Sequence, residues 1–171
     1  MKTFLFVCLL FTATILLGTP TEFAVKGFTI TQELVLPVEA NTAFAMMTGD
    51  IGGWWDHTFS EHPQALFIEP KAGGGFYEMF DDQGHGVRHA SVTWAEPGKR
   101  LRFEGPLGLA GNAINMVTTW DYEAMGDSTH VICTVNLTGQ VDADKAAIVE
   151  SVWRHFLIEQ LQPWVNKQKQ K

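Results

Sequence analysis

The segment 142-DADKAAIVESVWRHFLIEQLQPW-164 decides the fold of this chain. Asp142 is a good helix N-cap, and the alanines that follow it favour helix. Apolar residues recur through the segment at helical spacing and form one broad stripe; they are Ile148, Val149, Val152, Trp153, Phe156, Leu157, Leu161 and Trp164. A helix with so wide an apolar face needs a curved sheet to cover it. Pro163 is expected to loosen its last turn.

Upstream of this helix, six segments have the composition and length of strands. They are Ala65–Glu69, Gly74–Phe80, Val87–Glu96, Arg100–Glu104, Ala113–Glu123 and Ser128–Thr138. Several connections between them are short and rich in Gly, Asp and Pro, as hairpin turns are. Residues 28–36 alternate apolar and polar side chains and predict a first strand that ends at Pro37. The chain therefore predicts an antiparallel sheet of about seven strands.

Two short helices are expected between the first strand and the remaining ones. Residues 39–47 are interpreted as the first helix, because Phe44 and Met47 lie on one face at helical spacing. Glycines at positions 49, 52 and 53 then interrupt the chain. We expect a second helical fragment between them that ends at the tryptophan pair.

Trp54 and Trp55 form an adjacent indole pair just before the run of strands. Each indole buries a large apolar area and keeps one N–H that needs a partner. The pair predicts either a plug at the open end of the sheet or the wall of an apolar cavity. Both roles can hold together, with one ring facing the interior of the cavity and the other packed on the sheet.

The first two dozen residues have the features of an export signal. Lys2 is followed by an almost wholly apolar run over residues 4–17, which Gly18-Thr19-Pro20 ends. A membrane-spanning helix needs about 20 apolar residues, so this run is short for an anchor. We predict a signal peptide or N-terminal apolar segment at 1–24 and a single domain at 25–171. The predicted location is periplasmic or secreted, and an uncleaved N-terminal tether is the alternative.

Charge and cysteine content narrow the possible partners. The 171 residues include twelve basic and nineteen acidic side chains, which gives a net charge of −7. Nucleic acids require a basic face, so no nucleic-acid partner is expected. Membrane contact is expected only through an uncleaved N-terminal segment. Cys133 is the only cysteine beyond the predicted signal, and the alternation around it indicates a buried strand position rather than a reactive thiol.

The order of these elements resembles that of a known superfamily. Its motifs in this chain are Leu36-Pro37-Val38-Glu39-Ala40, Asp50-Ile-Gly-Gly-Trp54-Trp55, Gly73-Gly74-Gly75-Phe76-Tyr77-Glu78, Trp94-Ala-Glu96-Pro97-Gly98-Lys-Arg-Leu101 with Phe103, and Val152-Trp153. Over residues 28–165 the chain resembles the START-like or Bet v 1-like (SRPBCC) superfamily. Within it, the chain is most similar to domains grouped with the C-terminal domain of the Hsp90 ATPase activator.

The resemblance implies an α+β helix-grip fold, in which a curved antiparallel sheet wraps around the long C-terminal helix. It also implies an apolar cavity between sheet and helix. Our leading hypothesis is a binding protein for a small apolar molecule, such as a lipid, a sterol or a polyketide-like compound, with no cofactor. The expected ligand-binding residues are Trp54, Trp55, Phe76, Tyr77, Met79, Met116, Trp120, Trp153 and Phe156. Specificity would come from a few polar groups such as Tyr77, Asn115 or His130.

Two alternatives stay open. The first is a cyclase-like or hydrolase-like enzyme for an aromatic or polycyclic substrate, with a histidine or carboxylate as base. Its catalytic residues are unknown, because no spacing dictates that the candidates meet; these are Tyr77, Glu78, Arg88, His89, Asp121, Tyr122 and His130. The second is an interaction module of the Hsp90-activator kind, which requires a cytosolic location and is therefore disfavoured by the export signal.

The histidines do not predict a metal site. His85 and His89 lie four residues apart near two aspartates, but glycines flank His85, and Arg88 would oppose a cation. A solvated hairpin is the favoured interpretation. His57 is expected in an irregular loop at the rim of the cavity, and His155 on the polar shoulder of the long helix.

Overall fold

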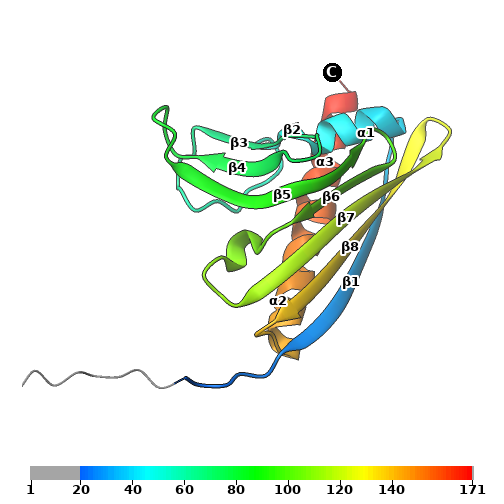
Figure 1. Ribbon diagram of the computed structural model, residues 1–171. Coiled ribbons are helices and arrows are strands. Elements are labelled where there is room, and N and C mark those ends of the chain that lie inside the picture. Colours follow the sequence, from blue (N-terminus) through cyan, green and yellow to red (C-terminus); the bar gives the residue numbers. More distant parts are fainter. Residues whose placement is uncertain (1–19, 171) are drawn as a thin grey trace, which may run out of the picture.

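The computed structural model describes residues 20–170, and it shows an α+β fold in which one sheet is packed against one long helix (Figure 1). The elements are β1 (Lys26–Leu36), α1 (Ala40–Met47), β2 (Gly49–Asp50), β3 (Ala65–Ile68), β4 (Gly75–Met79), β5 (Gly86–Glu96), β6 (Arg100–Glu104), a 3-10 helix (Leu107–Leu109), β7 (Ile114–Met125), β8 (Ser128–Gly139), α2 (Ala143–Arg154), a π-helical segment (His155–Leu161) and α3 (Gln162–Lys169). The predicted α+β architecture is confirmed.

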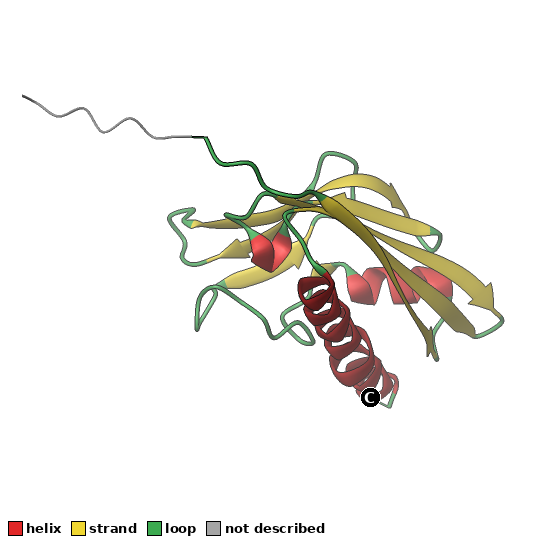
Figure 2. Cartoon of the chain, turned by 90° about the horizontal axis from the view of Figure 1, so that it is seen from below, coloured by secondary structure: helices red, strands yellow, loops and turns green. Residues whose placement is uncertain are grey.

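All eight strands belong to one antiparallel sheet with the order β1-β8-β7-β6-β5-β4-β3-β2. Consecutive strands pair through hairpins, except that β1 crosses over to pair with β8 along its whole length. The sheet is curved, and α2 and α3 lie against one of its faces (Figures 1 and 2). The six strands predicted downstream of the tryptophan pair all form, to within two residues at each end.

The long helix begins as predicted and runs further than expected. The Asp142 side chain accepts a hydrogen bond from the backbone N–H of Lys145 at 2.8 Å, which satisfies one free donor of the first turn. Residues 155–161 then widen into π-helix, where the backbone N–H of Gln162 donates to the carbonyl of Leu157, five residues earlier. Pro163 has no N–H to contribute, and the wider turn precedes it directly. The helix continues beyond Pro163 as α3.

The prediction of a second short helix before the tryptophan pair is wrong. Residues 49 and 50 instead form the edge strand β2, which raises the number of strands to eight. A single turn follows, in which the backbone N–H groups of Trp54 and Trp55 both donate to the carbonyl of Ile51. Gly53 explains why no helix continues, because the backbone here passes close to α3. A Cβ added at Gly53 would lie 2.6 Å from Nε1 of Trp164.

The core lies between the concave face of the sheet and the long helix. Its largest fully buried side chains include Trp120, Trp153, Phe76 and Phe103, which contact one another mostly edge-to-face. Each such aromatic pair contributes about 0.5–1.5 kcal/mol beyond the area it buries. Cys133 lies in this core as predicted, and burial raises the pKa of its thiol, which makes it unreactive.

The predicted export segment, residues 1–24, falls almost entirely outside the described residues. It therefore stays a prediction. Within residues 20–170, no helix is long and apolar enough to cross a membrane.

Candidate functional site: an apolar pocket with a buried glutamate–histidine pair

The two adjacent tryptophans contact each other edge-to-face, with ring centroids 5.6 Å apart, but differ in their other neighbours. Trp54 packs toward the core against Trp120, and its indole N–H donates to the carbonyl of Met46 at 3.3 Å. Trp55 stacks on Phe156 with ring centroids 3.8 Å apart, and its N–H donates to the carbonyl of His57 at 2.9 Å. Both indoles are thus buried with their polar groups satisfied. Trp54 fills the core, whereas Trp55 reaches a pocket.

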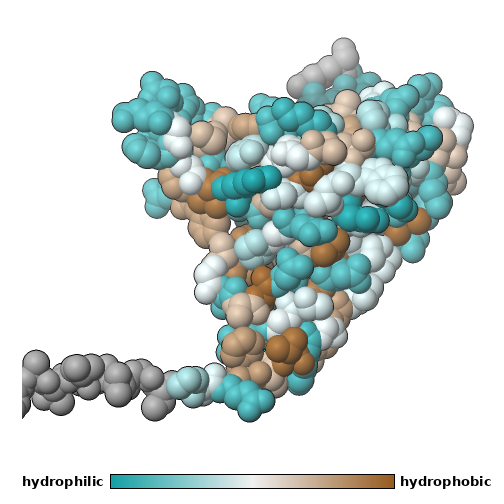
Figure 3. All heavy atoms as spheres, in the orientation of Figure 1, coloured by the Kyte–Doolittle hydropathy of each residue, from teal (hydrophilic) through white to brown (hydrophobic). Residues whose placement is uncertain are grey.

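That pocket has a volume of about 270 Å³ and lies between the sheet and the long helix. Its walls come from Trp55 and the loop after it, from β4, β5 and β7, from the 3-10 helix, from α2 and from the π-helical segment. They are Trp55, His57, Thr58, Phe59, Phe76, His89, Leu107, Gly108, Leu109, Met116, Ile148, Val149, Val152, Trp153 and Phe156. Phe59 and Ile148 are more than half exposed, so they form the rim. In Figure 3 the outline is hollowed beneath the lobe of β3–β5, and apolar atoms gather there.

A β-bulge lies at His89, in the pocket wall. On β5, Arg88 pairs with Tyr77 and Ala90 pairs with Phe76, so His89 is the extra residue between them. Bulges often re-aim a side chain beside a functional site. The His89 ring is 6% exposed and lies between two phenylalanines, stacked on Phe59 at 5.4 Å and tilted against Phe76 at 5.0 Å.

Behind His89 lies Glu78, which is fully buried. One carboxylate oxygen is 3.0 Å from Nε2 of His89 and accepts a hydrogen bond from the backbone N–H of Phe59 at 3.0 Å. The other oxygen accepts from the backbone N–H of Ser60 at 2.7 Å. Three donors thus surround a carboxylate that would be very costly to bury alone. The same bonds fix the loop that carries the pocket rim onto β4.

The Glu78–His89 pair also determines which ring nitrogen of His89 can accept a hydrogen bond from another group. Burial lowers the pKa of His89, while the hydrogen bond and the charge of Glu78 oppose that effect. A neutral imidazole ring carries a single N–H. The Glu78 carboxylate only accepts hydrogen bonds, so the N–H of His89 lies on Nε2, the nitrogen that faces Glu78. Nδ1 of His89 is then an acceptor. Within residues 20–170 no hydrogen bond to Nδ1 is formed.

Five of the nine residues predicted to bind ligand line this pocket: Trp55, Phe76, Met116, Trp153 and Phe156. Trp54 and Trp120 are buried in the core instead. Tyr77 and Met79 alternate with the inward-facing Phe76 and Glu78, so they lie on the opposite face of the sheet. There Tyr77 contacts Phe67 and Arg88. Binding itself stays a prediction for all nine.

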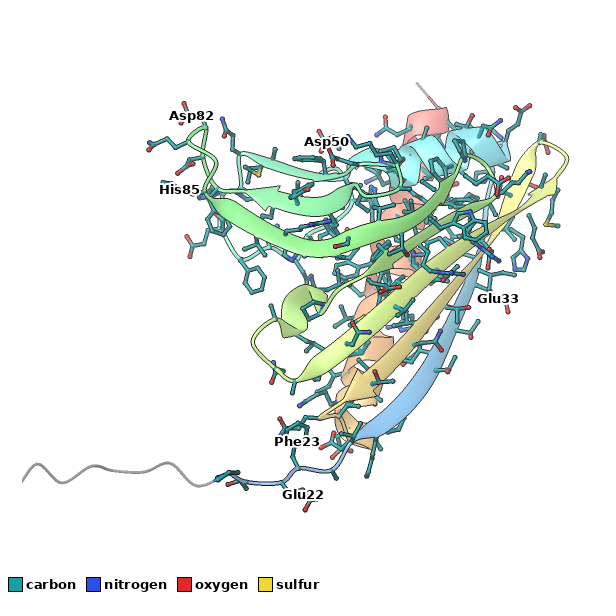
Figure 4. The ribbon with its side chains drawn as sticks, viewed as in Figure 1. Glu22, Phe23, Glu33, Asp50, Asp82 and His85 are labelled. Atoms are coloured by element: carbon teal, nitrogen blue, oxygen red, sulfur yellow. The ribbon has the colours of Figure 1, made fainter. Side chains whose placement is uncertain are left out.

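The polar residues expected to confer specificity lie outside the pocket. Asn115 is exposed on β7. His130 bridges Glu33 of β1 and Glu123 of β7, and these two carboxylates raise its pKa, the hydrogen bond to Glu123 being the larger effect. Glu33 projects from the outer side of β1 in Figure 4.

The other catalytic candidates also lie away from the pocket. Asp121 forms an ion pair with Arg100. Burial raises the pKa of the Tyr122 phenol, which packs on Phe44. Of the candidates with titratable side chains, only Glu78 and His89 meet at the pocket.

The two histidines considered for a metal site lie apart from each other. His85 is exposed in the turn and pairs with Asp81 at 2.7 Å, whereas His89 is buried with Glu78. Figure 4 shows His85 and Asp82 at the outer tip of the β4–β5 hairpin.

Sequence reasoning missed the 3-10 helix as part of the pocket. Leu107 is buried, and its backbone adopts the left-handed conformation, with φ of 48°. This conformation is unusual for a residue other than glycine. Backbone strain of this kind often accompanies functional sites. Two leucines in a short connection between strands, at 107 and 109, are the signal that could have identified this wall.

No protein-family model matches this chain, and no curated protein matches it. Among solved structures, Mll3558 from Rhizobium loti is similar with a TM-score of 0.59 and 23% identity, over 78% of this chain and 94% of its own. A protein from Rhizobium leguminosarum is similar with a TM-score of 0.62 and 14% identity, over 86% and 99%. DynU16, from the dynemicin biosynthetic locus, has a TM-score of 0.55 and 16% identity, over 81% of this chain and 47% of its own. At these identities, the likeness concerns the fold.

Proposed function

We propose that this protein is an exported binding protein that holds a small, largely apolar molecule in the pocket between its sheet and its long helix. The observation that carries the proposal is an apolar pocket whose wall contains one buried and oriented polar group, His89. Ligand sites in proteins typically combine apolar walls with a few fixed polar groups. The element order and the fold neighbours further support placing the chain in the START-like (SRPBCC) superfamily.

The pocket suggests the chemistry of the ligand. A volume of about 270 Å³ is slightly below the range of about 300–1,000 Å³ that is usual for small-molecule sites, which favours a compact ligand. The rings of Trp55, Phe76 and Phe156 offer flat surfaces for a ring or a short chain. Nδ1 of His89 offers an acceptor. A compact apolar molecule that carries one hydroxyl group, of the lipid, sterol or polyketide-like class, matches this combination.

The test is a binding screen by native mass spectrometry and thermal shift, using pairs of apolar compounds with and without a hydroxyl group. We expect binding of hydroxylated members, and a loss of at least about tenfold in affinity in Val152→Phe, which fills the pocket. Val35→Phe is the matched control, because Val35 is exposed on β1 outside the pocket. A ligand whose affinity is equal in both variants would overturn the proposal, as would a screen without any binder.

The buried Glu78–His89 pair favours one second candidate, an enzyme in which His89 acts as general base. A carboxylate that fixes one ring nitrogen and leaves the other as acceptor is the arrangement that general-base histidines use. His89→Gln separates the two functions. In an enzyme, turnover of a bound compound falls about 10²–10⁴-fold. In a binder no product forms with either protein, and only affinity changes.

A further inference from the structure

Three potential metal ligands converge at the edge of the pocket, and one of them, His57, also lines it. Asp56 and His57 follow the tryptophan pair, and His155 is the first residue of the π-helical segment. Their ligand atoms all lie within 4.8 Å of one another. Nδ1 of His57 is 2.7 Å from one Asp56 oxygen, and Nε2 of His155 is 2.9 Å from the other.

These separations are close to those of a tetrahedral metal site. Zinc bonds to histidine nitrogen and carboxylate oxygen are about 2.0–2.1 Å long, which places neighbouring ligand atoms about 3.3 Å apart. One Asp56 oxygen, Oδ1, lies 2.7 Å from Nδ1 of His57 and 3.1 Å from Nε2 of His155, so these two contacts would need to lengthen by about 0.2–0.6 Å. All three side chains are partly exposed, so they can make this adjustment without disturbing the core.

A second layer of contacts orients His155. Its Nδ1 lies 3.0 Å from Glu159, and Glu159 is held in turn by Arg154 at 2.6 Å. Metal-binding histidines almost always donate their other ring N–H to such a group. The side-chain amide of Gln160 donates to Asp56 at 3.0 Å and orients that carboxylate as well.

The His155 ring lies between two carboxylates. Both ring nitrogens face carboxylates, Glu159 on one side and Asp56 on the other. A neutral imidazole has a single N–H for these two acceptors. The second contact needs a positive charge at Nε2, which either a proton or a metal ion supplies.

The π-helical segment gives the cluster its shape. In π-helix, residues five apart lie on one side, so His155 and Gln160 both reach Asp56. Single π-helical turns within α-helices are rare and frequently occur at functional sites. The widened turn thus coincides with the place where the loop after Trp55 meets the long helix.

We propose that Asp56, His57 and His155 bind one divalent transition-metal ion of the zinc class at the mouth of the pocket. Two imidazoles and one carboxylate are a ligand set that such ions accept. Remaining coordination positions are left to water or to a polar group of a bound molecule. His57 also lines the pocket and packs edge-on against Phe156 at 4.9 Å, so an ion there would order the rim.

The test uses the full chain without a histidine tag, stripped of metal with a chelator and free of added ligand. Calorimetric titration with Zn²⁺ is expected to show one ion per chain, and Co²⁺ to give the visible absorption of a tetrahedral site. Asp56→Asn and His155→Gln should each weaken Zn²⁺ binding at least tenfold. Because Trp55 is hydrogen-bonded to His57, Co²⁺ should also quench tryptophan emission.

His85→Gln is the matched control, since His85 forms the same kind of pair with Asp81 at 2.7 Å but has no second histidine beside it. It should bind Zn²⁺ like the wild type. His57→Gln, at a more exposed position, tests the site if His155→Gln fails to fold, as judged by thermal melting of the metal-free variants. Absence of saturable one-to-one binding, or an equal loss in His85→Gln, would overturn the proposal. Failure of Zn²⁺ binding is distinguishable from failure of ligand binding in the pocket, because these titrations contain no added ligand.

Discussion

At the scale of single residues, the buried Glu78–His89 pair supplies a polar group in the otherwise apolar pocket wall. Glu78 and His89 both stood among the candidates, yet nothing in their spacing required contact. A regular hairpin register places them diagonally on one face, and the bulge makes His89 the extra residue opposite Phe76 and Tyr77. Tyr77 and Met79 were expected among the ligand-binding residues, but they lie on the sheet face opposite Phe76 and Glu78, because neighbours along a strand alternate. Asp56 and His155 meet across 99 positions, which local pattern reasoning cannot detect.

His89 should make the protein less stable in acid. Burial lowers its pKa in the folded state. Above the unfolded-state value of about 6.5, the ring is neutral in both states and contributes no pH dependence. Below it the unfolded chain binds the proton more readily, so the free energy of unfolding falls until folded His89 is protonated too. Urea denaturation between about pH 8 and pH 5 should show a steeper loss in the wild type than in His89→Gln.

The other five histidines are present in both proteins, so their contributions cancel in that comparison. An NMR titration gives a direct check, with the His89 midpoint expected below 6.5. A midpoint above 6.5 would mean that the pairing with Glu78 outweighs burial.

Removing the Glu78 side chain should be among the most destabilising single changes in the sheet. Glu78→Ala leaves His89 and the backbone N–H groups of Phe59 and Ser60 without their acceptor. Breaking a buried pair of this kind costs about 3–5 kcal/mol. Chemical denaturation measures the loss, and Glu104→Ala, at an exposed strand position, should stay within about 0.5 kcal/mol of the wild type. Equal stabilities of the two variants would refute the structural role of Glu78.

At the scale of elements, the strands and the long helix were predictable because their apolar residues follow simple periods. Alternation located β5 and β8, and the stripe from Ile148 to Leu161 located α2 and its continuation. The error lay between Gly49 and Trp55, where one of three glycines, Gly53, marks a close approach to the Trp164 side chain. That approach depends on Trp164, more than a hundred residues later, and no local pattern reveals it.

Gly53→Ala tests this contact between the loop and α3. The new Cβ would lie 2.6 Å from Nε1 of Trp164, so either the loop or the helix must shift. Overpacking of this kind costs about 1–3 kcal/mol. Gly108→Ala is the matched control, since nothing lies within 4 Å of a Cβ there. Thermal melting of both should show a lower midpoint for Gly53→Ala alone; a fall of the same size in the control would contradict the proposed contact.

For the whole molecule, element order predicted a curved sheet packed around a long helix, and the observed topology agrees. The single-domain organisation stays a prediction. The order of the strands in the sheet follows from pairing each strand with the next one along the chain, except that β1 pairs with β8. That crossover could be anticipated only through the resemblance to other helix-grip proteins, because nothing within 26–36 specifies a partner so far along the chain.

Export of the protein, directed by residues 1–24, is a prediction about the whole chain. Residues 1–24, fused before an alkaline phosphatase that lacks its own signal, should give enzyme activity outside the bacterial cytoplasm, where that enzyme becomes active. Replacing Leu9 and Leu10 by Arg interrupts the apolar run and should abolish the activity. Mass spectrometry of the exported product locates any cleavage. Equal activity of the two fusions would show that the segment does not direct export.

The pairing of β1 with β8 has a consequence for how the protein folds. Lys26 pairs with Gly139, so the first strand to be synthesised obtains its hydrogen-bonding partner almost last. Contacts between residues so distant in sequence carry a high loop-closure entropy, which slows folding to the millisecond-to-second range typical of sheet proteins. A chain leaving the ribosome therefore cannot close its sheet early. The β1 edge of the sheet is completed only when nearly all of the chain has emerged.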